Sequence, residues 1–220
     1  MSFSACLFDL DGVLVDTAKY HYLAWKRLAK ELGFDFLEVD NERLKGVSRM
    51  ASLDILLEVG GIDGVSDSDK IKMADKKNGW YVDYISKMTP DEILPGALDF
   101  LKEVKAAGVK IALGSASKNA GMILDRVHIK SLFDAVIDGN RVTHAKPDPE
   151  VFLLGAQELS AHPSRCVVFE DAAAGIEAAI RAGMQSVGVG NPAILHRANT
   201  IIPGFQQITW EQICKSIQSL

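Results

Sequence analysis

The sequence has little cysteine and no cluster of positive charge. Its three cysteines, Cys6, Cys166 and Cys214, are odd in number and have no paired spacing, which favours reduced thiols over a disulfide framework. The formal net charge is -5, and no dense run of Lys and Arg is present. Nucleic acids and anionic membranes are bound mainly through clustered Lys and Arg, so we expect neither kind of partner.

Long apolar runs and common cofactor motifs are also missing. The first apolar stretch has no basic leader and meets an acidic residue at Asp9, so we predict no signal peptide. No run reaches the length of a transmembrane helix, and the expected location is the cytoplasm. No Gly-x-Gly-x-x-Gly follows the first apolar run, no Gly-x-x-x-x-Gly-Lys occurs and the five histidines are scattered, which argues against dinucleotide, P-loop and zinc sites.

Uncharged strand-like segments alternate with helix-like segments over most of the chain. The expected strands are Ala5–Phe8, Val109–Leu113, Ala135–Ile137, Cys166–Phe169 and Ser186–Val189. Helices are expected around Leu98–Val104, from about Asn119, over about Glu150–Leu159, over Ala173–Ala182 and from Trp210 to the end. This alternation is typical of a doubly wound, parallel α/β sheet.

Between about Asp16 and Met88 the pattern changes to helical and polar segments without a convincing strand. Asp16 is the expected N-cap of the first helix, which Gly33 ends. We therefore predict an all-helical cap domain over residues 16–92, inserted into an α/β core made of residues 1–15 and 93–220. The flanking segments, Asp16-Thr17 and Thr89-Pro90-Asp91, are expected to act as hinges.

Two carboxylates, Asp9 and Asp11, follow directly on the first apolar run. Side chains two residues apart on an extended chain point the same way, and like charges held that close need a cation or a substrate group between them. One reading is a magnesium site with one carboxylate free to attack. The other is a solvated turn in which Gly12 supplies a positive φ.

Other polar residues also stand at predicted strand ends. Ser115 follows one strand, and Glu170 and Asp171 follow another. Ligands of doubly wound sheets bind outside the carboxyl ends of the strands, so we expect these residues and Asp9 to converge on one crevice. Glu170 and Asp171 have a second reading, as N-cap of the helix that begins near Ala173, and the two readings are compatible.

Together these motifs resemble the haloacid dehalogenase superfamily of aspartate-nucleophile phosphotransferases. The resemblance rests on Asp9-Leu10-Asp11-Gly12-Val13, on Ser115, on Lys146 within Lys146-Pro147-Asp148-Pro149 and on Glu170-Asp171, in the superfamily's order over nearly the whole chain. It implies a Rossmann-like core with a helical cap. It also implies that Asp9 is the nucleophile, that Asp11 is the general acid and base, and that Asp9, the Asp11 backbone carbonyl, Glu170 and Asp171 hold one Mg²⁺. Phosphoryl oxygens would be held by Ser115, the Ala116 N–H and Lys146.

Several stretches resemble the β-phosphoglucomutase family within that superfamily. They are Asp16 to His21 with Trp25, Leu44 to Arg49, Lys76 to Asn78, and Ser115 to Asn119. The resemblance places Arg49 at a second, distal phosphate, for which its planar fork is suited. Further substrate-binding candidates are Ser117, Lys118, Asn119, Thr17, His21, Trp25, Lys45, Gly46, Ser52 and Lys76. Of these, Trp25 is expected to serve packing more than binding. A single helical histidine such as His21 is more often a surface or core residue, but the resemblance favours a role for it in coupling cap closure to the acid-base group.

The function implied by the resemblance is interconversion of β-D-glucose 1-phosphate and D-glucose 6-phosphate. The reaction would pass through an aspartyl-phosphate enzyme and a β-glucose 1,6-bisphosphate intermediate, in a monomer whose partners are small sugar phosphates. A sugar-phosphate phosphatase on the same scaffold is the nearest alternative. A binding or regulatory protein without activity is the third, and it is disfavoured because every core position carries a chemically competent residue.

Overall fold

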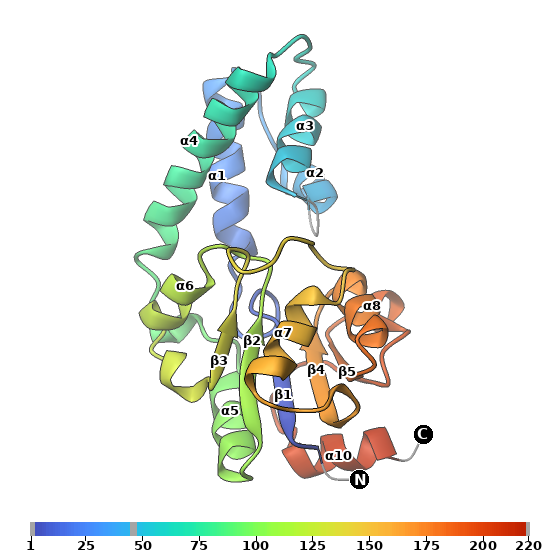
Figure 1. The fold of residues 1–220 in the computed structure, drawn as a ribbon. Coiled ribbons are helices and arrows are strands. Elements are labelled where there is room, and N and C mark those ends of the chain that lie inside the picture. The colour runs from blue at the N-terminus through green and yellow to red at the C-terminus, as the bar shows by residue number, and fades with distance from the viewer. Residues whose placement is uncertain (1–2, 45–47, 219–220) are drawn as a thin grey trace. The chain divides into compact units, whose positions relative to one another are not determined.

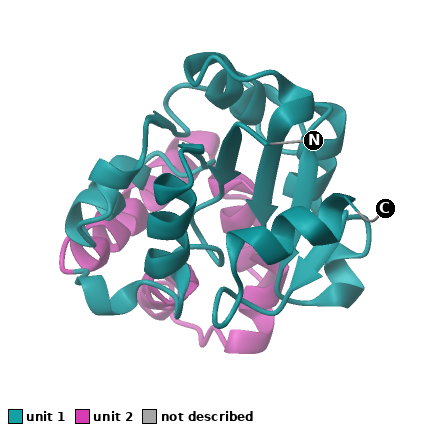
Figure 2. Cartoon of the chain, turned by 90° about the horizontal axis from the view of Figure 1, so that it is seen from below, with its two compact units in different colours: residues 1–16, 88–220 teal, residues 17–87 magenta. Residues whose placement is uncertain are grey.

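The computed structural model describes residues 3–44 and 48–218, which fall into two compact units. One unit comprises residues 1–16 and 88–220, and the other residues 17–87 (Figure 2). The second boundary lies at 87–88 rather than at the expected 92–93. The short 3₁₀ turn Pro90–Glu92 belongs to the first unit, because it leads into Ile93, which bridges to Val15, and Leu94, whose N–H donates to the Leu14 carbonyl at 2.8 Å.

A six-stranded parallel sheet forms the centre of the first unit (Figure 1), with the strand order β3-β2-β1-β4-β5-β6. The strands are β1 Ala5–Phe8, β2 Lys110–Gly114, β3 Ala135–Ile137, β4 Cys166–Glu170, β5 Gln185–Val189 and β6 Thr200–Ile202. The prediction of a doubly wound parallel sheet is confirmed, and five of these strands were expected. The edge strand β6 was not.

Helices pack on both faces of this sheet. They are α5 Ala97–Ala106, α6 Ala120–Arg126, α7 Glu150–Glu158, α8 Ala173–Arg181, the short α9 Pro192–Leu195 and α10 Trp210–Gln218. A buried cluster joins Leu7 of β1 and Ala112 of β2 to Phe152 of α7 and Ala179 of α8, so α7 and α8 cover one face.

The opposite face of the sheet is held by aromatic side chains. Phe8 of β1 stacks on Phe169 of β4 with ring centroids 4.6 Å apart, and Phe100 of α5 meets Phe169 edge-on at 5.3 Å. Phe205 packs on Phe100 at 4.9 Å. Successive strand residues point to opposite faces and both faces are covered, so the strand interiors are uncharged and charged side chains stand only at strand ends.

The second unit contains helices and no strand among its described residues, 17–44 and 48–87. The helices are α1 Ala18–Glu31, α2 Glu38–Asn41, α3 Arg49–Val59 and α4 Asp67–Ile85. Thr17, not Asp16, is the N-cap of α1, while Ser48 and Ser66 cap α3 and α4 through their hydroxyl oxygens. Among the described residues of the whole chain, no helix has both the length and the apolar content to cross a membrane.

Candidate active site

Three neighbouring strands bring the predicted core residues to one edge of the sheet. Asp9 follows β1, Ser115 follows β2 and Glu170 ends β4, and β1 lies between β2 and β4. The pairing of Phe8 with both Leu113 and Phe169 sets the register, and the Asp9 N–H donates to the Phe169 carbonyl at 3.0 Å. The expected convergence at the carboxyl ends of the strands therefore holds for these three residues.

Lys146 joins two of the carboxylates. Its ammonium lies 2.6 Å from Asp9 Oδ1 and 2.8 Å from Glu170 Oε2, and its side chain is only 11% exposed. Burial alone would lower the pKa of Lys146, but the charges of Asp9 and Glu170 together raise it above its usual value. The lysine therefore remains charged, and it does so at the candidate nucleophile rather than on the protein surface.

Glu170 is the most confined acid of the group. Its side chain is 2% exposed, and burial, with the neighbouring Asp9 and Asp171 charges, raises its pKa above the ordinary value against the opposing effect of Lys146. A second cation beside Glu170, in addition to Lys146, would stabilise the ionised form of its buried carboxylate.

Two glycines leave the space that the acidic side chains occupy. Gly12 has φ +75°, and a Cβ on it would lie 2.0 Å from Asp171 Oδ2. A Cβ on Gly175, in the first turns of α8, would lie 2.0 Å from the Glu170 carboxyl carbon. Gly12 thus has the positive φ expected if Asp9 to Gly12 form a turn. Because it has no side chain, it also leaves room for the Asp171 carboxylate.

The donor set fits a divalent cation. Asp9, Glu170 and Asp171 each offer a carboxylate oxygen, and these oxygens lie within 4.8 Å of one another. Lys146 supplies one positive charge against three carboxylates, which leaves the group negative and built of the oxygen donors that Mg²⁺ prefers.

The alternative prediction, that Glu170 and Asp171 cap helix α8, is only partly supported. Ala172, not Glu170 or Asp171, is the N-cap of α8, although Glu170 Oε1 accepts from the Ala172 N–H at 3.3 Å.

The segment after β2 is shaped by its serines. Ser115 is buried, and its Oγ accepts a hydrogen bond from the Ser117 N–H at 3.1 Å, while Ser117 Oγ accepts from the Asn119 N–H at 3.3 Å. Asn119 is the N-cap of α6. Ala116 and Lys118 are exposed within this turn. Ser115 therefore lies at the end of β2, the strand next to the one that Asp9 follows. The other predicted residues of this segment, 117–119, lie further along the chain toward α6.

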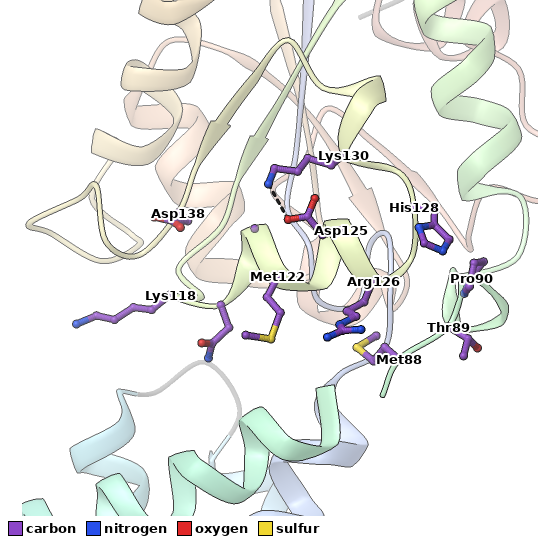
Figure 3. A pocket seen from close by; sticks show the side chains of 12 residues that line it. Met88, Thr89, Pro90, Lys118, Met122, Asp125, Arg126, His128, Lys130 and Asp138 are labelled. Carbon is purple, nitrogen blue, oxygen red and sulfur yellow. Dashed lines mark hydrogen bonds and ion pairs between the residues drawn. The ribbon is translucent and has the colours of Figure 1, made fainter. Parts of the chain in front are cut away.

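A cavity of about 770 Å³ lies beside α6 in the same unit (Figure 3). Lys118 and Asn119 line it together with Met122, Arg126 and Met88. None of Asp9, Ser115, Lys146 or Glu170 does. The cavity is therefore next to the predicted substrate residues but is not the place where the buried charges meet.

In the second unit, α1 and α4 bury a lysine among aromatic rings. The Lys77 ammonium lies 2.9 Å from His21 Nδ1, 4.4 Å from the centre of the Trp25 ring and 5.2 Å from that of Tyr81. Burial, aided by the nearby charge of Arg49, lowers the pKa of Lys77 to about 7. Burial and the charges of Lys77 and Arg49 lower the pKa of His21 to about 3. The His21 ring stacks on Tyr81 at 4.0 Å, and the Tyr81 hydroxyl donates to Thr17 Oγ1 at 3.5 Å.

Arg49 begins α3 and is held from α4. Its guanidinium donates to Asn78 Oδ1 at 2.8 Å and lies 3.7 Å from Asp75 Oδ1, with 37% of the side chain exposed. Ser52, one turn further along α3, is buried. Arg49 is thus restrained by the neutral amide of Asn78 and the exposed carboxylate of Asp75. Its guanidinium group remains partly available to bind an anion.

Comparison with known proteins gives the family of this chain. Residues 3–183 match the family model described as haloacid dehalogenase-like hydrolase. The chain belongs to the haloacid dehalogenase-like hydrolase family. The predicted superfamily resemblance is confirmed by a match that spans Asp9, Ser115, Lys146 and Glu170.

Relatives and solved structures add detail within the family. The chain is 41% identical over 208 residues to a β-phosphoglucomutase of Bacillus subtilis (strain 168), covering 94% of this chain and 92% of the relative. It is 31% identical to a phosphorylated carbohydrates phosphatase of Thermotoga maritima, covering 83% of each chain. It is also similar to a crystal structure of β-phosphoglucomutase from Clostridium difficile, with a TM-score of 0.89, 44% identity and coverage of 99% and 98% of the two chains.

Substrate binding by Lys76 stays a prediction, and the structure places its neighbour Lys77 beside two other predicted residues, His21 and Trp25. Lys76 lies on the surface, where its ammonium is 2.5 Å from Glu31 and the side chain is 56% exposed, whereas the next residue, Lys77, reaches His21 and Trp25. His21 and Trp25 are four residues apart, and so are Lys77 and Tyr81. This helical spacing is the sequence signal that could have identified Lys77 as the buried lysine. Lys45 and Gly46 lie outside the described residues.

Proposed function

We propose that this protein is a magnesium-dependent β-phosphoglucomutase that interconverts β-D-glucose 1-phosphate and D-glucose 6-phosphate. The reaction would use an aspartyl-phosphate enzyme and β-glucose 1,6-bisphosphate as intermediate and activator. The observation that carries the proposal is the buried arrangement of Lys146 between Asp9 and Glu170. Identity of 41% and 44% to β-phosphoglucomutases over nearly the whole chain supports the choice of substrate.

The first unit would carry out phosphoryl transfer. The Asp9 carboxylate attacks phosphorus, and Asp11 protonates the leaving sugar oxygen and later takes a proton from the incoming hydroxyl. Ser115 and the Ala116 N–H hold phosphoryl oxygens, and Lys146 offsets negative charge at Asp9. Asp9, the Asp11 carbonyl, Glu170 and Asp171 would hold Mg²⁺, which when bound neutralises charge on the transferring phosphoryl group.

The second unit would select the substrate. Arg49 is the proposed ligand of the phosphate that is not being transferred, with Asn78 orienting its fork. We assign Lys77, in place of Lys76, to the substrate-binding set together with Thr17 and His21. Trp25 supplies the ring on which the Lys77 ammonium rests. The two units are proposed to be the core and cap domains predicted from the sequence, in a cytoplasmic monomer.

The proposal is tested by incubating purified protein with Mg²⁺, β-glucose 1-phosphate and a trace of β-glucose 1,6-bisphosphate. Glucose 6-phosphate and free phosphate are followed together. Glucose 6-phosphate that greatly exceeds free phosphate is the expected result. Asp9→Asn is the matched control, because it keeps the size of the side chain and removes the nucleophile, and it should form neither product.

A sugar-phosphate phosphatase is the second candidate, because the chain is also 31% identical to a phosphorylated carbohydrates phosphatase. Nucleophile, metal ligands and general acid would be shared, and water would take the place of the sugar hydroxyl. Free phosphate as the main product, with little glucose 6-phosphate, would favour this function over the mutase.

A further inference from the structure

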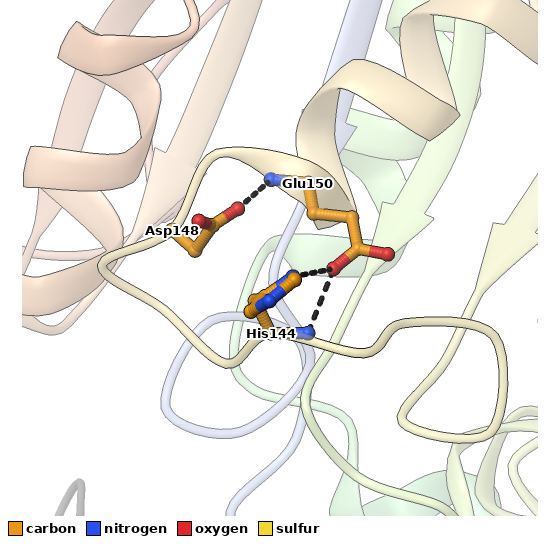
Figure 4. Close-up of side chains that lie close together, drawn as sticks. All are labelled: His144, Asp148 and Glu150. Carbon is orange, nitrogen blue, oxygen red and sulfur yellow. Dashed lines mark hydrogen bonds and ion pairs between the residues drawn. The ribbon is translucent and has the colours of Figure 1, made fainter.

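The loop that carries Lys146 is fastened to the first residue of α7. Both carboxylate oxygens of Glu150 accept hydrogen bonds from the Thr143 N–H at 3.1 Å and from the Thr143 hydroxyl at 3.0 Å. Glu150 Oε2 also accepts from the His144 N–H at 2.7 Å and lies 3.1 Å from His144 Nδ1 (Figure 4). One carboxylate thus binds donors of two successive residues.

Lys146 lies inside the segment that Glu150 closes. The Asp148 N–H donates to the Ala145 carbonyl at 3.0 Å, so a tight turn surrounds Lys146, and Asp148 Oδ1 accepts from the Glu150 N–H at 2.9 Å (Figure 4). The Lys146 ammonium also lies 4.8 Å from the centre of the Phe152 ring, and Phe152 is on α7. Helix α7 therefore holds the loop on one side at Glu150 and contacts the lysine at Phe152.

His144, Asp148 and Glu150 are also close enough together to be considered as metal ligands. Their polar atoms are used within the loop, since Glu150 receives the donors of Thr143 and His144, and Asp148 receives the Glu150 N–H. Hydrogen bonding inside the loop explains the cluster without a metal.

We propose that Glu150 is a positioning residue that holds the 143–148 loop so that the Lys146 ammonium is placed between Asp9 and Glu170. This inference rests on the proposed function only for its effect on turnover. The structural part, the placement of Lys146, stands on the contacts alone.

The chemistry of the contact requires an ionised carboxylate. The Thr143 N–H, the Thr143 hydroxyl and the His144 N–H all donate hydrogen bonds to the Glu150 carboxylate. The backbone N–H groups of His144 and Thr143 lower the pKa of Glu150 to about 2. Glutamine has almost the same shape but only one accepting oxygen, and its NH₂ group would face N–H donors. Glu150→Gln therefore removes the negative charge and one of the two accepting oxygens without changing the volume of the side chain.

The test compares Glu150→Gln and Glu150→Ala with Glu158→Gln. Glu158 is the last residue of α7 and pairs with Arg141, two residues before the 143–148 loop. The control therefore removes a carboxylate contact between α7 and the segment that leads into the loop, but not at the residues flanking Lys146. Two measurements need no turnover. They are the rate of acylation of Lys146 by a small activated ester, followed by peptide mass spectrometry, and hydrogen exchange of the amides of residues 143–146.

In both Glu150 variants we expect acylation of Lys146 to be about tenfold faster or more, the change that loss of a charge-assisted hydrogen bond permits. Exchange at Thr143 and His144 should also rise, and kcat of the mutase should fall by more than KM changes. Glu158→Gln should leave all these quantities near those of the wild type.

Unchanged Lys146 reactivity in the Glu150 variants, whether or not turnover falls, would overturn the positioning role. So would an equal increase in the Glu158→Gln control. If the wild-type protein had no mutase activity but Lys146 was still acylated faster in the Glu150 variants, the positioning role would stand and the proposed function would be rejected. Failure of the positioning role and failure of the proposed function are therefore distinguishable.

Discussion

At the residue scale, the charge state of the candidate site depends on which groups are buried beside one another. Lys146 is kept protonated by Asp9 and Glu170, and Glu170 is buried with two further carboxylates nearby. Removing any partner from a buried set leaves an uncompensated charge, which costs more than the intact set contributes. The site is therefore sensitive to small steric changes that move a single carboxylate.

Gly175→Ala tests this sensitivity. The added methyl would stand 2.0 Å from the Glu170 carboxyl carbon, so the carboxylate must leave the position in which it now lies 2.8 Å from the Lys146 ammonium. We expect the free energy of unfolding to fall by about 1–3 kcal/mol, as for other overpacked sites. We also expect weaker Mg²⁺ binding. Urea unfolding without Mg²⁺ and titration of the folded protein with Mg²⁺ measure the two effects.

Gly121→Ala is the matched control, because Gly121 is also helical and a Cβ on it meets nothing within 4 Å. Alanine favours a helix over glycine, so this variant should be more stable than the wild type by about 0.5–1 kcal/mol. Equal effects of the two substitutions would show that the space beside Glu170 is not limiting.

At the scale of the elements, strand ends were predictable and side-chain directions were not. The apolar runs before Asp9, Ser115 and Glu170 identify buried parallel strands, and the fold rule then brings their ends together. Strand β6 was missed because only two of its residues, Ile201 and Ile202, are apolar and Pro203 follows at once, whereas the equally short edge strand β3 is apolar throughout. The burial of Lys77 and the exposure of Lys76 were not predicted, because they depend on how α4 is rotated against α1, which a single helix pattern leaves open.

The α1–α4 contact predicts an unusual dependence of stability on pH. Lys77 has a folded pKa of about 7, below its ordinary value of 10.5, so the unfolded chain binds more protons between these two values. The cost of burying the charge is fully present below pH 7 and disappears as pH rises toward 10.5, at about 1.4 kcal/mol per pKa unit. Lys77→Met should therefore raise the free energy of unfolding at pH 7 and gain less over wild type at pH 10, as urea unfolding at both pH values would show.

Lys76→Met provides the control for this experiment. Its side chain is exposed and its ion pair with Glu31 is at the surface, so we expect a change of less than about 1 kcal/mol at either pH. A Lys77→Met variant less stable than the wild type at pH 7 would mean that the Trp25, Tyr81 and His21 contacts outweigh the cost of burial.

At the scale of the whole molecule, the proposed chemistry is divided between the two units. The residues assigned to phosphoryl transfer belong to residues 1–16 and 88–220, and those assigned to the second phosphate belong to residues 17–87. The sequence predicted this division from a block of helical pattern between the first and second strands. Motif resemblance was needed to assign Arg49, because nothing in the pattern of a polar helix N-terminus distinguishes it from a surface arginine.

The division predicts that mutase turnover and phosphorylation of the enzyme can be separated. Arg49→Ala should reduce formation of glucose 6-phosphate by about 100-fold or more, because a bidentate phosphate ligand is lost. Phosphorylation of Asp9 by acetyl phosphate, which has no second phosphate, should be little changed. Arg43→Ala is the matched control, since Arg43 is another exposed arginine of the same unit, paired with Glu58 at 2.9 Å, and both activities should persist. If Arg49→Ala reduced both activities equally, Arg49 would act on the transferred phosphoryl group or on folding, and the second phosphate would need another ligand.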